Sequence, residues 1–190
     1  MRTLLAWAGD DPARAGLVDT PARVASAFED YFSGYGADAA AALTGAFEEP
    51  TGYDDMVLLK DIKFTSHCEH HIAPFTGRAH IAYIPDGRVV GLSRIARIVD
   101  IFSRRLQTQE ALTSQIANAL MSGLACKGVA VMLNAEHTCV SMRGARHDGV
   151  ATITMRLLGA FETDAAWRDR FLALVARQDQ DTTANGQPCR

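Results

Sequence analysis

A cluster of cysteine and histidine residues is the strongest chemical signal in this sequence. The segment Cys68-Glu69-His70-His71 places one thiol and two imidazoles within four positions, and a further thiol, Cys139, follows His137 downstream. Zinc accepts thiolate and imidazole ligands together, and a Cys and a His separated by two residues can reach one ion from a tight turn. The spacing therefore predicts a metal site at Cys68, with the segment Glu136-His137-Thr138-Cys139 as its one credible distant partner.

The spacing does not decide which histidine completes this site, because His67, His70 and His71 all lie near Cys68 in the chain. A structural zinc site normally has four protein ligands in two short pairs, whereas the downstream segment Glu136-His137-Thr138-Cys139 has no second pair. Three protein ligands with water in the fourth position are typical of a catalytic site. We therefore interpret the cluster as a catalytic metal site.

The remaining cysteines and His80 are expected to have no part in the chemistry. Cys126 and His80 stand apart from the cluster, and a lone Cys or His more often packs than binds metal. Cys189 lies in a polar tail. In a cytosolic domain of this size, grouped Cys and His residues more often indicate metal or catalysis than disulfides.

The composition of the chain limits the classes of function. With 190 residues and 48% hydrophobic content, the chain is large enough for one domain with a core. Its apolar runs are far shorter than the ~20 residues of a spanning helix, and no secretory signal pattern is present, so we expect a cytoplasmic protein without membrane segments. A formal net charge of -3 argues against general nucleic-acid binding, although a few arginines in a pocket could still bind a small polyanion.

The elements that must position the cluster indicate an α+β domain. Residues 1–50 are predicted to form an N-terminal helical segment, residues 51–177 a catalytic domain and residues 178–190 a disordered tail. Apolar patterns predict strands over 56–64, 79–84, 129–133 and 150–158, and helices from 93, over 109–124 and over 165–176. We expect an antiparallel four-stranded sheet with helices packed on one face, and Ser93 as the N-cap of its helix.

At the level of whole motifs, the sequence resembles the GTP cyclohydrolase I family. The resemblance runs from Gly9 to Phe161, and the order and spacing of its motifs are more specific than any one of them. The motifs include Thr20-Pro21-Ala22-Arg23, Cys68-Glu69-His70-His71, Gly91-Leu92-Ser93-Arg94, Gln107-Thr108-Gln109-Glu110 and His137-Thr138-Cys139-Val140-Ser141-Met142-Arg143-Gly144.

The resemblance implies a reaction, a fold and an assembly. GTP and water would become 7,8-dihydroneopterin triphosphate and formate, the first step of folate and pterin biosynthesis, with zinc as the cofactor. The implied fold is the tunnelling fold. The implied assembly is a homodecamer, a dimer of pentamers, with active sites at subunit interfaces.

The resemblance also implies a role for each matching residue. It assigns the zinc ligands to Cys68, His71 and Cys139. It assigns acid/base catalysis to His70 and His137, with Ser93 as a further catalytic candidate in the rearrangement of the opened ribose. The implied substrate-binding residues are Gln109 and Glu110 in the guanine pocket and, at the triphosphate, Arg23, Arg94, Arg97 and Arg143.

Two other functions stay open on the sequence. A related tunnelling-fold enzyme could act on another purine or pterin, although Glu110, Ser93 and the arginines argue against it. A scaffold stabilised by zinc could have no activity, in which case His70 and His137 would be dispensable. Arg94 and Arg97 stand at i and i+3, where a solvated helix face is the usual explanation, so their roles depend on the resemblance.

Overall fold

The computed structural model describes residues 1–45, 47–48 and 52–177. The predicted tail, residues 178–190, lies outside the described residues. The helices in chain order are α1 (Arg2–Trp7), α2 (Thr20–Tyr31), the 3-10 helix η1 (Ser33–Gly36), α3 (Ala39–Ala42), α4 (Leu92–Ser103), α5 (Gln109–Gly123), α6 (Thr138–Ser141), α7 (Ala160–Thr163) and α8 (Ala165–Ala176). The strands are β1 (Phe47–Glu48), β2 (Val57–Cys68), β3 (Pro74–Pro85), β4 (Arg88–Val89), β5 (Leu106–Gln107), β6 (Cys126–His137) and β7 (Ala151–Gly159).

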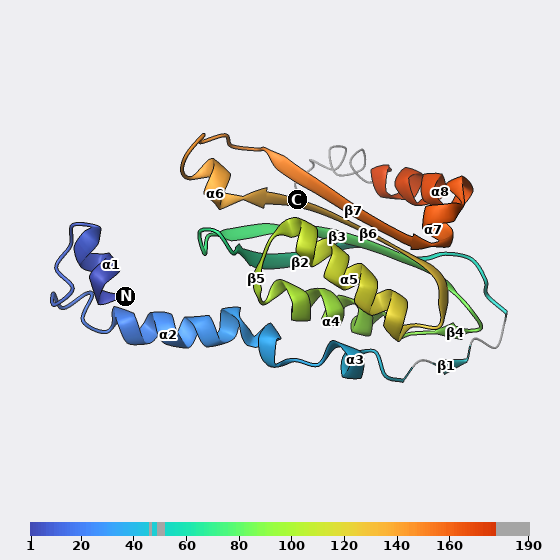
Figure 1. The fold of residues 1–190 in the computed structure, drawn as a ribbon, viewed down its shortest axis with the longest axis horizontal. Helices are drawn as coiled ribbons and strands as arrows, with labels where there is room; N and C mark the ends of the chain where they lie inside the picture. The colour runs from blue at the N-terminus through green and yellow to red at the C-terminus, as the bar shows by residue number, and fades with distance from the viewer. Residues whose placement is uncertain (46, 49–51, 178–190) are drawn as a thin grey trace, which may run out of the picture.

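The main sheet is five-stranded and mixed, in the order β5-β2-β3-β6-β7, as Figure 1 shows. Strands β2, β3, β6 and β7 pair antiparallel, but β5 pairs parallel with β2, joining Leu106 to His67 and Gln107 to Cys68. The prediction of a four-stranded antiparallel sheet is therefore wrong in this detail. A strand of two residues carries no periodic pattern, so only the return of the chain after α4 places it beside β2.

One face of the sheet forms the larger core with α4 and α5. Side chains alternate along a strand, so Ile81 and Tyr83 of β3 face these helices. They join Ile98 of α4 and Ile116 of α5, which are fully buried. Each such burial contributes roughly 1.5–3 kcal/mol, and together they fix both helices against the strands.

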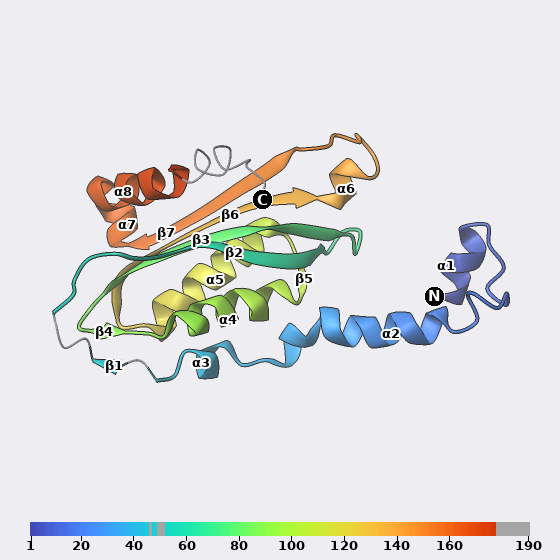
Figure 2. The ribbon, with the colours of Figure 1, turned by 180° about the vertical axis from the view of Figure 1, so that it is seen from behind.

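The opposite face of the sheet is covered at one end by α7 and α8, as Figure 2 shows from behind. Phe161 and Phe171 pack there against Ala82, Ile84 and Ala130, the residues of β3 and β6 that point away from α4 and α5. The expectation of helices on one face is therefore wrong. The predicted helix 165–176 is present with those bounds, but its apolar residues pack on the second face because β3 and β6 are apolar on both faces here.

The N-terminal helices extend away from the sheet (Figures 1 and 2). Neither α1 nor α2 has a buried residue, and Trp7 is 86% exposed. Only the end of α2 reaches the domain, where the Tyr31 ring stacks on His67 at 4.8 Å between centroids. Among the described residues, no helix is both long enough and apolar enough to cross a membrane.

We expect Phe171→Ala to destabilise the protein by about 3–5 kcal/mol, because the side chain is fully buried and its loss leaves a cavity under α8. The measurement is thermal unfolding at one fixed protein concentration, with a fall in Tm of roughly 10 °C. Arg168→Ala on the same helix removes only an exposed ion pair with Asp169 and should change stability by less than about 0.5 kcal/mol. Equal melting of the two variants would mean that α8 is not docked on the sheet.

Candidate metal centre and active site

The turn between β2 and β3 brings His71 back towards Cys68. Cys68 ends β2, and its carbonyl oxygen accepts hydrogen bonds from the backbone N–H of His71 at 3.3 Å and of Ile72 at 2.8 Å. Ile72 has φ of 53°, in the left-handed region that a β-branched residue rarely adopts. This tight turn places the His71 ring beside the thiol, with Nδ1 3.8 Å from Cys68 Sγ.

Strand pairing carries Cys139 to the same place. β3 pairs with β6 so that Phe75 lies opposite His137, and α6 follows immediately with Cys139 in its first turn. The Thr138 hydroxyl donates to the Pro74 carbonyl at 2.6 Å and fastens the start of α6 to the start of β3. Cys139 therefore faces the β2–β3 turn although it is distant in sequence.

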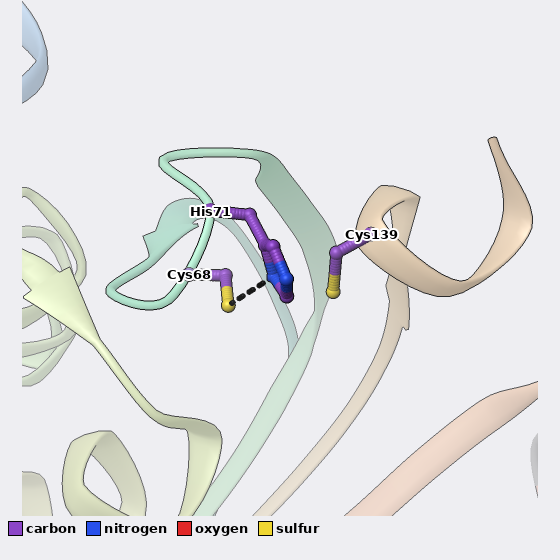
Figure 3. A group of neighbouring side chains, drawn as sticks. All are labelled: Cys68, His71 and Cys139. Carbon is purple, nitrogen blue, oxygen red and sulfur yellow. Dashed lines mark hydrogen bonds between the residues drawn. The ribbon is translucent and has the colours of Figure 1, made fainter. Parts of the chain in front are cut away.

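Cys68, His71 and Cys139 form a group that could hold a metal ion, since their ligand atoms all lie within 4.8 Å of one another (Figure 3). Metal–sulfur bonds of about 2.3 Å and metal–nitrogen bonds of about 2.0 Å bring tetrahedral ligands to within roughly 4 Å of each other, so a small closure suffices. Two sulfurs and one imidazole leave one position of a tetrahedron open. The donor set and its spacing therefore fit a tetrahedral metal ion with room for a water molecule.

The Cys139 thiol of this group favours its neutral form when no metal is bound. Burial raises the pKa of the Cys139 thiol, and the neighbouring Cys68 raises it further. Since the thiolate is the ligand, binding of a metal must release the Cys139 proton, and the affinity for metal falls as the pH is lowered.

The other two histidines of the cluster lie outside the metal group. His70 is mostly exposed, with Nδ1 3.7 Å from Cys68 Sγ and Nε2 3.9 Å from the Glu69 carboxylate. His67 turns towards α2, is 8% exposed, and its pKa is lowered by burial. His67 Nδ1 is a buried polar atom with no hydrogen-bond partner among the described residues.

His137 immediately precedes α6, the helix that carries Cys139, and its ring is held by Phe75 and Gln109. Its ring stacks on Phe75 at 4.4 Å between centroids with an interplanar angle of 5°, and its Nε2 is 2.8 Å from Gln109 Oε1. Burial lowers the pKa of His137, and the charge of Glu110 opposes that shift. Sequence reasoning missed Phe75, whose part follows only from its pairing opposite His137 across β3 and β6.

Gln109 and Glu110 begin α5 but differ in exposure. The Thr108 hydroxyl caps the helix by accepting from the Ala111 N–H at 3.1 Å. Gln109 is then turned into the protein with 2% exposure, whereas Glu110 is exposed. The Gln109 carboxamide contacts β6 and β7, including Thr154, another residue without a sequence signal.

The four predicted triphosphate arginines are not gathered at the metal group within one chain. Arg143 Nη1 lies 3.1 Å from His71 Nε2, so this guanidinium is at the site. The others have partners elsewhere: Arg23 pairs with Asp19 at 3.4 Å, Arg97 pairs with Asp100 at 2.8 Å, and Arg94 donates to the Thr44 carbonyl.

Ser93 lies with Arg94 at the start of α4. The N-cap is Gly91, whose backbone is extended and whose carbonyl accepts from the Arg94 N–H at 2.9 Å, so the prediction of Ser93 as the cap is wrong. Figure 1 shows α4 starting near β4 and ending near β5, the strand that pairs with Cys68. A helix of 12 residues spans about 18 Å, so Ser93 lies most of a helix length from the metal end of the sheet.

The fold and the site define an α+β protein with a candidate metal centre of two thiols and one imidazole, flanked by further histidines. A family model described as GTP cyclohydrolase I matches residues 1–176. The chain therefore belongs to the GTP cyclohydrolase I family.

Individual proteins support the same family. The GTP cyclohydrolase 1 of Maricaulis maris (strain MCS10) is 54% identical over 177 residues, covering 93% of this chain and 86% of that protein. The GTP cyclohydrolase 1 of Sinorhizobium fredii (strain NBRC 101917 / NGR234) is 55% identical over 175 residues, covering 92% and 85%. The crystal structure of an archaeosine synthase QueF-like protein in the apo form matches with a TM-score of 0.45 and 19% identity, over 54% of this chain and 91% of that one, a likeness too slight to add to the fold.

We expect Cys139→Ala to lower the bound metal after dialysis by more than about tenfold, because it removes one of two sulfur ligands. Elemental analysis of the purified protein measures the metal per chain. The matched control is Cys126→Ala, a half-buried cysteine in contact with Met121 and outside the group, which should keep the wild-type metal content. Loss of metal in both variants, or in neither, would contradict the assigned ligands.

Proposed function

We propose that this chain is a zinc-dependent GTP cyclohydrolase I that converts GTP and water to 7,8-dihydroneopterin triphosphate and formate. Membership of the family supports the reaction. The observation that carries the proposal is the convergence of the ligand atoms of Cys68, His71 and Cys139 within 4.8 Å. Thiolate with imidazole is a donor set that suits zinc, and three ligands leave a position for water.

The reaction needs a nucleophile at carbon 8 of guanine and proton transfers around it. The chemistry that zinc supplies when bound is a lowered pKa of water, to about 7. His70, beside Cys68, and His137, beside Cys139, are the groups that we propose to carry protons to and from the purine ring and the formamide. A histidine titrates near neutrality, so it can act as acid and base in turn. Ser93 and His137 are the candidates for the later proton transfers on the ribose.

Guanine recognition is assigned to Glu110 and phosphate recognition to Arg143. The Glu110 carboxylate is exposed in the first turn of α5, next to the residue that contacts His137. A carboxylate accepts hydrogen bonds from the amino group and ring N–H of guanine, an arrangement that adenine cannot make. Arg143 is in contact with His71, and a guanidinium suits phosphate oxygens.

We propose that the site is completed between subunits. Ser93 and Arg94 begin α4, at the far end of that helix from the strand that pairs with Cys68, and Arg23 lies on the extended α2. A second chain would bring these residues to the metal end, as in a tunnelling-fold homodecamer built as a dimer of pentamers. The exposed N-terminal helices give such an assembly further surface to cover. We expect the enzyme to work in the cytoplasm.

The proposed activity is tested by incubating the metal-loaded protein with GTP and measuring formate and the fluorescent oxidised neopterin. We expect His70→Ala to lower kcat by roughly 10²–10⁴-fold, the contribution of a general acid or base. His147→Ala, an exposed histidine in the loop before β7, is the control and should keep wild-type turnover. Wild-type protein with full metal content and no turnover of GTP would overturn the proposal.

A shared site predicts recovery of activity in mixed oligomers. His70→Ala and Arg97→Ala should each be nearly inactive alone, while co-expressed chains carrying one change each should regain measurable turnover. Arg97 suits this test because it lies on α4 with Arg94 and its ion pair with Asp100 is exposed, so its loss should not unfold the protein. If the mixed oligomer is as inactive as its parents, His70 and Arg97 serve the same site within one chain.

A further inference from the structure

The buried contacts of Gln109 determine which way round its carboxamide lies. Nitrogen Nε2 is 2.8 Å from the backbone carbonyl oxygen of Thr152 and 3.3 Å from that of Leu133. A carbonyl oxygen can only accept a hydrogen bond, so a donor must face it. The reversed amide would put its oxygen 2.8 Å from the Thr152 carbonyl oxygen, with no hydrogen between them. The NH₂ group therefore faces β6 and β7, and the oxygen faces His137.

Two threonines reinforce this orientation. The Thr113 hydroxyl donates to the Gln109 backbone carbonyl at 2.7 Å, so its hydrogen is used. The contact of 2.6 Å between the Thr113 and Thr154 hydroxyls must then be donated by Thr154. Thr154 Oγ1 keeps its lone pairs for Gln109 Nε2, 3.1 Å away. Each hydrogen bond among Gln109, Thr113 and Thr154 therefore has a single possible donor.

The direction of these hydrogen bonds determines which nitrogen of His137 carries the hydrogen. Gln109 Oε1 carries no hydrogen and lies 2.8 Å from His137 Nε2, so Nε2 must donate. A neutral imidazole has one N–H, which leaves Nδ1 as the atom with a free lone pair. Stacking on Phe75 fixes the plane of the ring, and Gln109 fixes which nitrogen bears the hydrogen. Among the described residues, His137 Nδ1 has no hydrogen-bond partner, and it is not one of the fully buried polar atoms that lack a partner.

We infer that Gln109 is a positioning residue: it holds His137 as the Nε2–H tautomer, so that Nδ1 is the nitrogen that exchanges a proton with the substrate. Gln109 then acts through His137 and does not touch GTP, in contrast to the guanine-pocket role implied by the family resemblance. Its 2% exposure and its three protein acceptors agree with this. The catalytic part of the inference rests on the proposed function, whereas the tautomer does not.

The tautomer is measured directly by ¹⁵N NMR on the full-length, metal-loaded protein labelled at its six histidines, in the solid state to allow for a large assembly. A spectrum at about pH 8, well above the ordinary histidine pKa of about 6.5, reports neutral rings. The signal missing from His137→Asn identifies His137. We expect hydrogen on Nε2 and none on Nδ1. Hydrogen on Nδ1 in the wild-type protein would overturn the inference, whatever the activity towards GTP.

Kinetics of Gln109→Met separate positioning from substrate contact. This change removes the acceptor, so we expect a mixture of His137 tautomers and a kcat about 10- to 100-fold lower, with KM for GTP within about threefold of wild type. If KM rises more than about tenfold while the tautomer is unchanged, Gln109 contacts GTP and the inference is wrong.

If Gln109→Met fails to fold because two buried carbonyls lose their donor, the ¹⁵N spectrum of the wild-type protein decides the inference without that variant. Gln109→Glu is a second variant: with its carboxyl protonated, one oxygen carries the hydrogen that faces the Thr152 carbonyl, and the other still accepts from Nε2–H, so hydrogen should stay on Nε2. Loss of hydrogen from Nε2 in Gln109→Glu would contradict the inference. Wild-type protein that shows the expected tautomer but does not turn over GTP would overturn the proposed function alone.

Discussion

The site depends on the pairing of β3 with β2 on one side and β6 on the other. Pro74 lies opposite His67 and Phe75 opposite His137, so the ends of both neighbouring strands meet at the start of β3. A slip of one residue in either register would turn the facing side chains to the other side of the sheet. Gly77 permits the close approach of β6, since a Cβ there would lie 2.6 Å from the Ala135 Cβ.

The packing that stabilises the domain also positions Gln109, which contacts His137. α5 is held on the sheet by its apolar residues, and its first residue, Gln109, is buried as part of the same contact. A buried carboxamide is costly unless its donors and acceptor are satisfied, and here β6, β7 and His137 satisfy them. The residues that fix the helix and the residue that orients the histidine are therefore parts of one core.

The residues proposed to take part in the reaction lie at opposite ends of the main sheet. The metal group, His70 and His137 lie where β2 and β6 end, while Ser93 and Arg94 lie where α4 begins. Helices on the second face close the end of the sheet away from the metal group, and the N-terminal helices leave the domain (Figure 1). This separation is the reason for proposing that two copies of the chain complete one site.

Sequence alone determined the parts that depend on local pattern and residue type. Cys68 and the histidines that follow it in the chain indicate a metal site, and the sequence motifs indicate the family. Apolar periodicity predicts the long strands and the helix at 165–176. Tertiary structure decided what depends on pairing and direction. The spacing leaves three histidines open and the resemblance selects His71; the turn with the left-handed Ile72 is the physical reason that His71 reaches the thiols. The return of the chain after α4 adds β5, and strands that are apolar on both faces allow α8 to pack on the second face. The resemblance implies a guanine-pocket role for Gln109, whereas its three protein acceptors are known only from the structure, because a hydrogen bond depends on where both of its atoms lie.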